Sequence, residues 1–285
     1  MKLNGLTRLL MLSGTLLASS WSAQATVVNL TTAGASGTIN GAIYTQVPQQ
    51  PTGTGFINSF VRIGANQDIV QAYNTTVNGV FDNFSSDTFD HEITVGQVGI
   101  ITIGANNVLR FLLDINQTGT SPLLNLDEVQ IFLSTTPNQS VTTFTGGVLN
   151  LASSALVYRM DTAVVDSWVT LDYSLNSGSG SGDMTLDILA SALNPAFTAL
   201  GLTTTAQKNG AYIYLYSKFG SSPNINNDGH EEWAHAVGNP IGEPPCVPTP
   251  ANGFCGQQQI PEPGSLPLVA AGLLGAWWAI RRRLI

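Results

Sequence analysis

Short segments in which apolar and polar residues alternate recur along the middle of this chain, and they constrain its fold more than any other feature. Alternation with a period of two is the pattern of a strand that packs one face on a core, whereas an amphipathic helix repeats about every 3.6 residues. The segments that alternate most clearly are 93–103, 108–115, 129–133, 148–158, 168–175, 184–189 and 211–219. Turns rich in Gly, Asn, Ser and Asp separate them, so each segment is predicted to be a strand.

No helical period is sustained between the two ends of the chain. Residues 189–200 can hold one short helix, but Pro195 is expected to interrupt it. Many short strands without crossover helices predict an all-β fold, an antiparallel two-sheet sandwich of jelly-roll type. The sandwich is expected to be one domain over residues 26–240, since all-β domains often reach this size.

Charged residues are sparse and unevenly placed. They make up 10 % of the 285 residues, with ten Lys or Arg against eighteen Asp or Glu. Half of the basic residues lie at the two ends of the chain, so the middle is more acidic than the formal charge of −8. Such a surface repels the phosphate backbone, and a nucleic-acid partner is excluded. The charge fits a solvated extracellular domain, with binding of a divalent cation as the alternative.

Residues 1–25 have the three parts of a secretory signal peptide. Lys2 and Arg8 supply positive charge, residues 9–18 form an apolar run, and Ala23-Gln24-Ala25 is a small-x-small cleavage site. The apolar run is shorter than the ~20 residues that a membrane span needs. Cleavage is therefore expected, and the mature protein should begin near Thr26.

The C-terminal end combines a linker with a tail of three parts. The linker, residues 241–260, is rich in Pro, Gly and Gln and should be extended. The tail, residues 261–285, contains the motif Pro261-Glu262-Pro263, the apolar run 266–280 and the basic residues Arg281, Arg282 and Arg283. The apolar run is expected to form a short transmembrane helix, with the Arg cluster in the cytoplasm. Because the signal peptide sends the preceding domain across the membrane, that domain should lie outside.

This order of a Pro-Glu-Pro motif, an apolar helix and a terminal basic cluster resembles the PEP-CTERM sorting signal. The resemblance covers about a tenth of the chain, and all three parts occur in order behind a signal peptide. It implies processing by exosortase, a membrane peptidase that recognises the Pro-Glu-Pro region, in a Gram-negative bacterium that makes exopolysaccharide. It also implies a transient stay in the inner membrane, followed by a place on the cell surface or outside the cell. A permanent C-terminal anchor is the alternative.

The two cysteines, Cys246 and Cys255, both lie in the linker. In an oxidising compartment two nearby cysteines most simply pair, and a zinc site needs about four ligands. A disulfide that closes a small loop beside the tail is therefore expected, with two free thiols as the alternative.

Tyr212, Tyr214 and Tyr216 alternate with apolar residues in one predicted strand. They would share one face at a spacing of about 6.6 Å, and a row of rings of this kind can stack on a polysaccharide. The alternative, which the ordinary composition of strands favours, is that the tyrosines are buried or merely cover an outer face.

The loop 224–235 resembles the first half of an EF-hand. Asn224, Asn226 and Asp228 occupy positions 1, 3 and 5, and a glycine follows at position 6. Position 1 is not Asp, however, and His235 stands at position 12 in place of the bidentate Glu. Calcium (Ca2+) is therefore a weak candidate, an Asn- and Gly-rich turn is the favoured alternative, and no other cofactor is expected.

The remaining titratable residues do not form a recognisable catalytic motif. His230 and His235 are separated by five positions, whereas the zinc-binding helix needs two His at i and i+4. Asp127 and Glu128 are adjacent, and neighbours on a strand face opposite sides, so they are not expected to act as a pair. The sequence predicts an exported structural or adhesive surface protein and not an enzyme, with a carbohydrate-binding module for the exopolysaccharide as the alternative.

Overall fold

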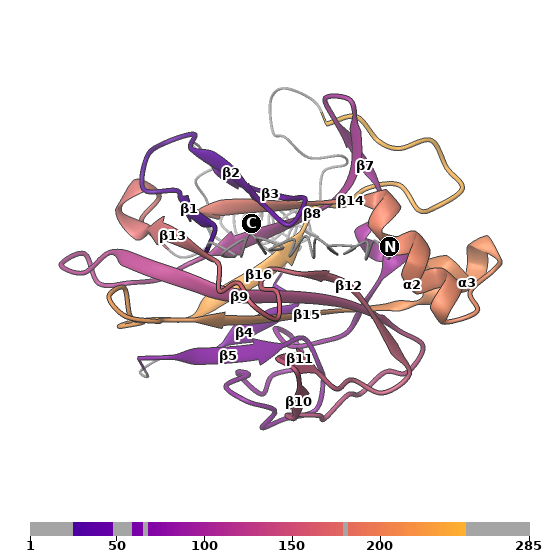
Figure 1. The fold of residues 1–285 in the computed structure, drawn as a ribbon, viewed down its shortest axis with the longest axis horizontal. Coiled ribbons are helices and arrows are strands. Elements are labelled where there is room, and N and C mark those ends of the chain that lie inside the picture. Colours follow the sequence, from indigo (N-terminus) through magenta and orange to yellow (C-terminus); the bar gives the residue numbers. More distant parts are fainter. Residues whose placement is uncertain (1–24, 48–58, 65–67, 179–181, 249–285) are drawn as a thin grey trace, which may run out of the picture.

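The computed structural model of the protein describes residues 25–47, 59–64, 68–178 and 182–248 (Figure 1). In this part the chain is mostly β, as the alternating segments predict, and two seven-stranded sheets dominate it. No helix in these ranges is long and apolar enough to cross a membrane. The expected sorting tail, and all of the expected signal peptide except its last residue, lie outside the described residues.

Sheet A has the strand order β1-β13-β9-β15-β5, with β12 also paired to β9 and β6 to β15. Its strands are β1 (Val27–Asn29), β5 (Val70–Tyr73), β6 (Ile93–Thr94), β9 (Leu123–Ser134), β12 (Ser154–Arg159), β13 (Trp168–Asp172) and β15 (Tyr212–Phe219). Only the pair of β1 with β13 is parallel among the described pairs of this sheet. The prediction of antiparallel sheets is therefore confirmed except at this edge, which makes sheet A mixed.

Sheet B has the strand order β2-β3-β14-β8-β16-β4, with β7 also paired to β8. Its strands are β2 (Ser36–Ile39), β3 (Ala42–Gln46), β4 (Val61–Ile63), β7 (Ile101–Ile103), β8 (Asn106–Asp114), β14 (Met184–Leu189) and β16 (Glu231–His235). A separate hairpin consists of β10 (Phe144–Thr145) and β11 (Val148–Leu149).

Eight of the strands pair in a nested order. The pairs are β4 with β16, β5 with β15, β8 with β14, and β9 with β13. The first and third pairs lie in sheet B, and the second and fourth lie in sheet A. Strands from both halves of the chain are therefore needed to complete either sheet.

The main apolar core contains residues of both sheets. Two hydrogen bonds between polar side chains cross it. Trp233 of β16, which is fully buried, donates its indole N–H to Oγ of Ser217 in β15 over 3.0 Å. The hydroxyls of Tyr44 in β3 and Tyr158 in β12 lie 2.8 Å apart. Both bonds join one sheet to the other, and they satisfy polar groups that burial would otherwise leave unpaired.

The predicted strand 93–103 is wrong in its middle, where the chain forms the short helix α1 (Val95–Val98). Thr94 accepts a hydrogen bond from the backbone N–H of Gln97, and the Gln97 side chain accepts one from the N–H of Thr94. This capping box starts a helix, and the apolar residues three positions apart, Val95 and Val98, are both buried. The capping-box residues Thr94 and Gln97 are present in the sequence, but the alternation of the residues on either side favoured a strand.

Helix α2 (Leu193–Ala199) confirms a helix within 189–200, but Pro195 does not interrupt it. Pro195 is the third residue of the helix, in the first turn, where backbone N–H groups have no intrahelical partner. The 3-10 turn η2 (Ala190–Ala192) leads into α2, and α3 (Thr205–Gly210) follows it. Both α2 and α3 lie at one end of the sheets (Figure 1).

Two further predicted strands are shorter than expected. Segment 148–158 contains β11 and β12 with a turn between them, and segment 168–175 ends as strand β13 before the 3-10 turn η1 (Tyr173–Leu175). Segment 129–133 is part of the longer β9. The predicted strands 108–115, 184–189 and 211–219 correspond closely to β8, β14 and β15.

Candidate functional site

The tyrosine stripe of β15 faces away from the main core, but two of its rings, Tyr214 and Tyr216, are closed to a ligand. Tyr214 is fully buried and Tyr216 is 3 % exposed, whereas Tyr212 is partly exposed. The Tyr214 hydroxyl donates to the carbonyl of Thr136 over 3.1 Å, and the Tyr216 hydroxyl donates to Oε1 of Gln71 over 2.7 Å. Tyr212, Tyr214 and Tyr216 therefore do not form an exposed glycan platform, and the favoured alternative, burial, is what the structure shows for Tyr214 and Tyr216.

A second apolar cluster covers this outer face of sheet A. It joins Tyr214 and Tyr216 to Tyr73 of β5 and to apolar residues of segments 77–81 and 141–151. The rings of Tyr73 and Tyr214 meet edge to face, with their centroids 5.9 Å apart. Sheet A therefore packs on both faces, against the main core on one and against this covering layer on the other.

The first half of the candidate calcium loop directs its three possible ligands to different partners. Asn224 donates to Oδ1 of Asn125 over 2.9 Å. Oδ1 of Asn226, a residue that is only 2 % exposed, accepts from Gln117 over 2.8 Å. Asp228 is exposed, and its Oδ1 accepts from the backbone of the following glycine. These bonds are typical of an Asn- and Gly-rich turn.

The second half of the expected calcium loop is strand β16. His235 pairs with Phe111 of β8 in the ladder, so position 12 does not curl back as an EF-hand requires. This segment therefore does not have the arrangement of an EF-hand loop. Within the described ranges, no group of three or more His, Cys, Asp or Glu side chains could hold a metal ion.

Asp127 and Glu128 lie at a β-bulge in β9. Against β15, Glu128 pairs with Lys218, but the next residue of β15, Phe219, pairs with Leu126. Asp127 is therefore an extra residue, which pairs with no residue of β15 in the ladder. A bulge breaks the alternation of side chains, and both carboxylates line the same cavity. The expectation that they face opposite sides is wrong for this reason.

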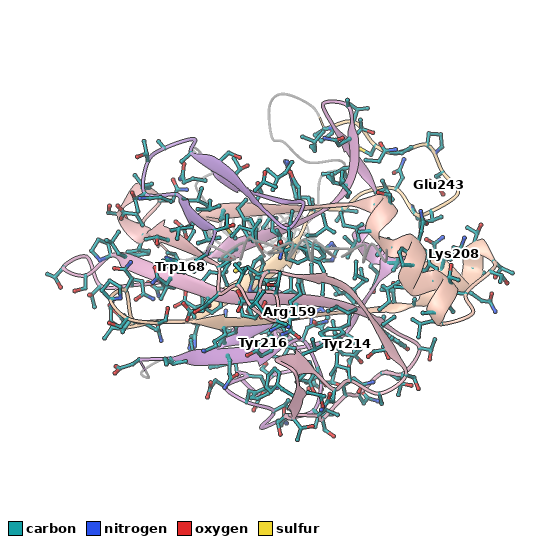
Figure 2. All side chains as sticks on the ribbon, viewed as in Figure 1. Arg159, Trp168, Lys208, Tyr214, Tyr216 and Glu243 are labelled. Carbon is teal, nitrogen blue, oxygen red and sulfur yellow. The ribbon has the colours of Figure 1, made fainter. Side chains whose placement is uncertain are left out.

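The cavity has a volume of about 250 Å3 and opens beside the β10–β11 hairpin. Its aromatic lining comes from Phe144 of the hairpin and Tyr216 of β15. Figure 2 labels two of the lining residues, Arg159 from β12 and Tyr216. Its charged lining is Asp127, Glu128, Asp161, Asp166, Arg159 and Lys218. No spacing in the sequence indicated this site, because its residues come from four separate parts of the chain, 127–130, 144–147, 159–166 and 216–221.

Burial and repulsion from neighbouring carboxylates raise the pKa values of Asp127, Glu128 and Asp161 in this cavity. The pKa of Glu128 rises to about 7, first because the side chain is buried and second because Asp161 lies near it. Arg159 opposes this rise, with its Nε 3.3 Å from Oε2 of Glu128. Burial also raises the pKa values of Asp127 and Asp161, and the charge of Asp166 adds to both. The carboxylates outnumber the cations that line the cavity.

Hydrogen bonds hold the hairpin beside the cavity. Gln130 of β9 donates to the carbonyl of Gly147 over 2.6 Å and accepts from the N–H of Leu149 over 3.0 Å. Arg159 donates to the carbonyl of Gly146 over 3.1 Å. Gly147 has a φ of 78°, and a Cβ there would lie 2.4 Å from Nη2 of Arg159. The positive φ is what favours a glycine here, because the atom that a Cβ would meet is the flexible end of the Arg159 side chain.

Another group of carboxyls is buried where β8, β14 and β16 meet. Oδ2 of Asp183 accepts from the N–H of Ile115 over 2.8 Å, and Glu231 accepts from Asn116 and Gln117. Burial raises the pKa values of Asp183 and Glu231, and the nearby charge of Asp114 adds to both. Their partners are backbone and amide groups of one turn, so these carboxyls fix the end of β8.

The start of the linker is held against sheet B. Cys246 is disulfide-bonded, and the N–H of Thr102 in β7 donates to its carbonyl over 2.7 Å. The expected partner, Cys255, lies outside the described residues, as do the Pro-Glu-Pro motif and the Arg cluster. Residues 241–248 are thus bonded to the domain and do not leave it at residue 240.

The C-terminal tail matches the family model of the PEP-CTERM protein-sorting motif over residues 259–283. The match spans Pro261-Glu262-Pro263 and the Arg cluster, so the resemblance read from the sequence is confirmed. No curated protein and no solved structure matched the chain. A motif of this kind implies an exported protein that exosortase sorts to the cell surface or the exterior.

Proposed function

We propose that this chain is a structural or adhesive protein of the cell surface or extracellular matrix in a Gram-negative bacterium that makes exopolysaccharide. The observation that carries the proposal is the sorting motif at residues 259–283. The low charge content and acidic balance of the chain also support it, since they suit a solvated exterior domain.

Sorting follows from the order of the segments. The signal peptide places Thr26 outside, the Arg cluster stays inside, and residues 266–280 cross the inner membrane transiently. Pro261-Glu262-Pro263 then lies just outside the bilayer. Proline disfavours a helical backbone, and an extended segment is what a peptidase cleft engages. Exosortase would cut near this boundary and pass the domain to the surface or the exterior.

We infer that the exported domain is a two-sheet sandwich with jelly-roll connectivity. The nested strand pairs that alternate between sheets A and B support this inference, because a jelly roll is a long hairpin folded over itself into two sheets. Such a domain has its stability spread over many long-range pairs, which suits a structural component exposed to the exterior.

The proposal assigns no reaction to the domain. Arg110 of β8 holds the buried Asp187 of β14 with two hydrogen bonds of 2.7 Å, so this pair of charges has a structural role. A carbohydrate-binding role is the second candidate function, and the observation that favours it is the polar cavity beside the β10–β11 hairpin.

Mass spectrometry of protein from the producing bacterium tests the sorting proposal. The mature protein should begin near Thr26 and lack the residues from about 266 onward. Replacing Pro261, Glu262 and Pro263 with Ala should leave a longer, membrane-bound form. The matched control replaces Gln257 and Gln258 with Ala, upstream of the motif, and should be processed normally. Intact Arg281-Arg282-Arg283 on all exported material would show that the tail is a permanent anchor.

A further inference from the structure

The cavity on the outer face of sheet A has a hydrogen-bond acceptor that makes no hydrogen bond within the described part of the protein. Asp166 lines it from the loop after β12 and is exposed. No hydrogen bond within the described residues holds its carboxylate, in contrast to Asp127, whose oxygens accept from the hydroxyl and N–H of Ser221. Asp166 is therefore ready to accept hydrogen bonds from a ligand.

The same cavity offers donors of the opposite charge. Lys218 of β15 is partly exposed and lies near enough to Asp127 to lower its pKa, although burial raises that pKa overall. Arg159 is held by Glu128 and Gly146, so its guanidinium stays at the cavity wall. A ligand that is only a cation would meet these two positive groups, and one that is only an anion would meet four carboxylates. Hydroxyl groups both donate and accept, and therefore complement both kinds of wall.

One side of the cavity is an aromatic ring. Phe144 of β10 is 38 % exposed and packs against Tyr216, with ring centroids 5.4 Å apart. The bonds from Gln130 and Arg159 to the hairpin hold this ring beside the charged wall. An exposed phenylalanine fixed at the rim of a polar cavity provides the apolar surface on which the C–H face of a sugar ring packs.

From this lining we propose that the cavity binds one neutral sugar ring, as the terminal or branching residue of a glycan. Its volume of about 250 Å3 is below the ~300–1,000 Å3 of sites that enclose drug-sized molecules, so it admits one ring and not a length of chain. The proposal deepens the carbohydrate-binding candidate, on which it rests, and gives that function a site in place of the tyrosine stripe. It does not depend on sorting.

Binding is measured by isothermal titration calorimetry on the protein as the bacterium exports it. The probes are glucose, galactose and mannose, together with the exopolysaccharide of the same bacterium. At least one sugar should bind in the millimolar range, because a single ring makes few contacts. The absence of binding by all four probes would overturn the proposal, as would binding of 1,4-diaminobutane without binding of any sugar.

Two variants locate the site. Phe144→Ala should weaken sugar binding about three- to tenfold, the value of one aromatic contact. The matched control is Phe84→Ala, which removes a ring that is 42 % exposed and does not line the cavity. It should leave binding unchanged.

Asp166→Asn should weaken binding about tenfold, since it removes the charge from an accepting group. Its carboxylate holds no described hydrogen bond, so folding should be unaffected and the result stays decisive even if Phe144→Ala folds poorly. Sugar binding that neither variant alters would place the site elsewhere and overturn the cavity assignment. Failure of the tail to be processed would bear on sorting alone.

Discussion

Removing the ring of Tyr214 should destabilise the domain, because this residue belongs to the packed layer on sheet A and not to an open platform. The ring is fully buried, and truncation of a buried aromatic residue to Ala typically costs ~3–5 kcal/mol. Within that sum, the edge-to-face contact with Tyr73 should contribute ~0.5–1.5 kcal/mol. The hydrogen bond to the Thr136 carbonyl should contribute ~1 kcal/mol.

Urea unfolding of Tyr214→Ala, Tyr214→Phe and Tyr212→Ala separates these contributions. Tyr214→Phe keeps the ring and should lose only the ~1 kcal/mol of the hydrogen bond. Tyr212→Ala is the matched control in the same strand; because Tyr212 is only partly buried, it should cost much less than Tyr214→Ala. The slope of the unfolding free energy with urea should stay the same in all three.

A double-mutant cycle with Tyr73→Ala isolates the contact between the two rings, with an expected coupling of ~0.5–1.5 kcal/mol. The reasoning would be refuted by a Tyr214→Ala variant that unfolds at the wild-type urea concentration. Equal losses for Tyr212→Ala and Tyr214→Ala would also refute it, since the structure gives the two rings different burial.

Three further predictions concern charge and ions. The folded pKa of Glu128, about 7, lies above its ordinary value of 4.5. The stability that its protonation contributes is fully present below the ordinary value and is lost as the pH rises through the folded value. Glu128→Gln should therefore flatten the fall in unfolding free energy between pH 4.5 and about 7, and an unchanged slope would contradict the shift. Arg110→Met should cost ~3 kcal/mol in urea unfolding, because it leaves the buried carboxylate of Asp187 unpaired, and the double variant with Asp187→Leu should recover part of this loss. Calcium at micromolar concentration should not raise the melting temperature, since the loop 224–235 lacks the acidic ligands of a tight site; a rise of several degrees would show that a site exists.

The sequence predicted the central strands well and the edge strands poorly. Strands β14 and β15 have clear alternation over six and eight residues, and their burial against the core enforces it. β2 and β4 have four and three residues, too few for a period of two to stand out from chance. β16 was hidden because its first residues, Glu231 and Glu232, look like a polar turn, although Glu231 is 1 % exposed.

The register of β9 was beyond what the sequence could predict. Regular alternation would place Asp127 and Glu128 on opposite faces, and only the pairing with β15 shows the extra residue at Asp127. A bulge arises from the fit between two strands far apart in the chain, which no local pattern encodes. The composition of strands favoured the burial of Tyr214, but the sequence could not show which residues cover it, since they lie in segments 77–81 and 141–151.

Whether a feature could be predicted from the sequence depends on how far apart in the chain the residues that form it lie. The sorting tail is read from 25 successive residues, because a peptidase recognises an extended segment and a membrane recognises an apolar run. The capping box at Thr94 is similarly local. The cavity instead joins Glu128, Phe144 and Arg159 with Asp166 and Lys218, residues that adjoin one another only after the nested strands have paired. The segment that directs export can therefore be recognised from the sequence, whereas the site that would bind a ligand outside the cell can be recognised only from the fold.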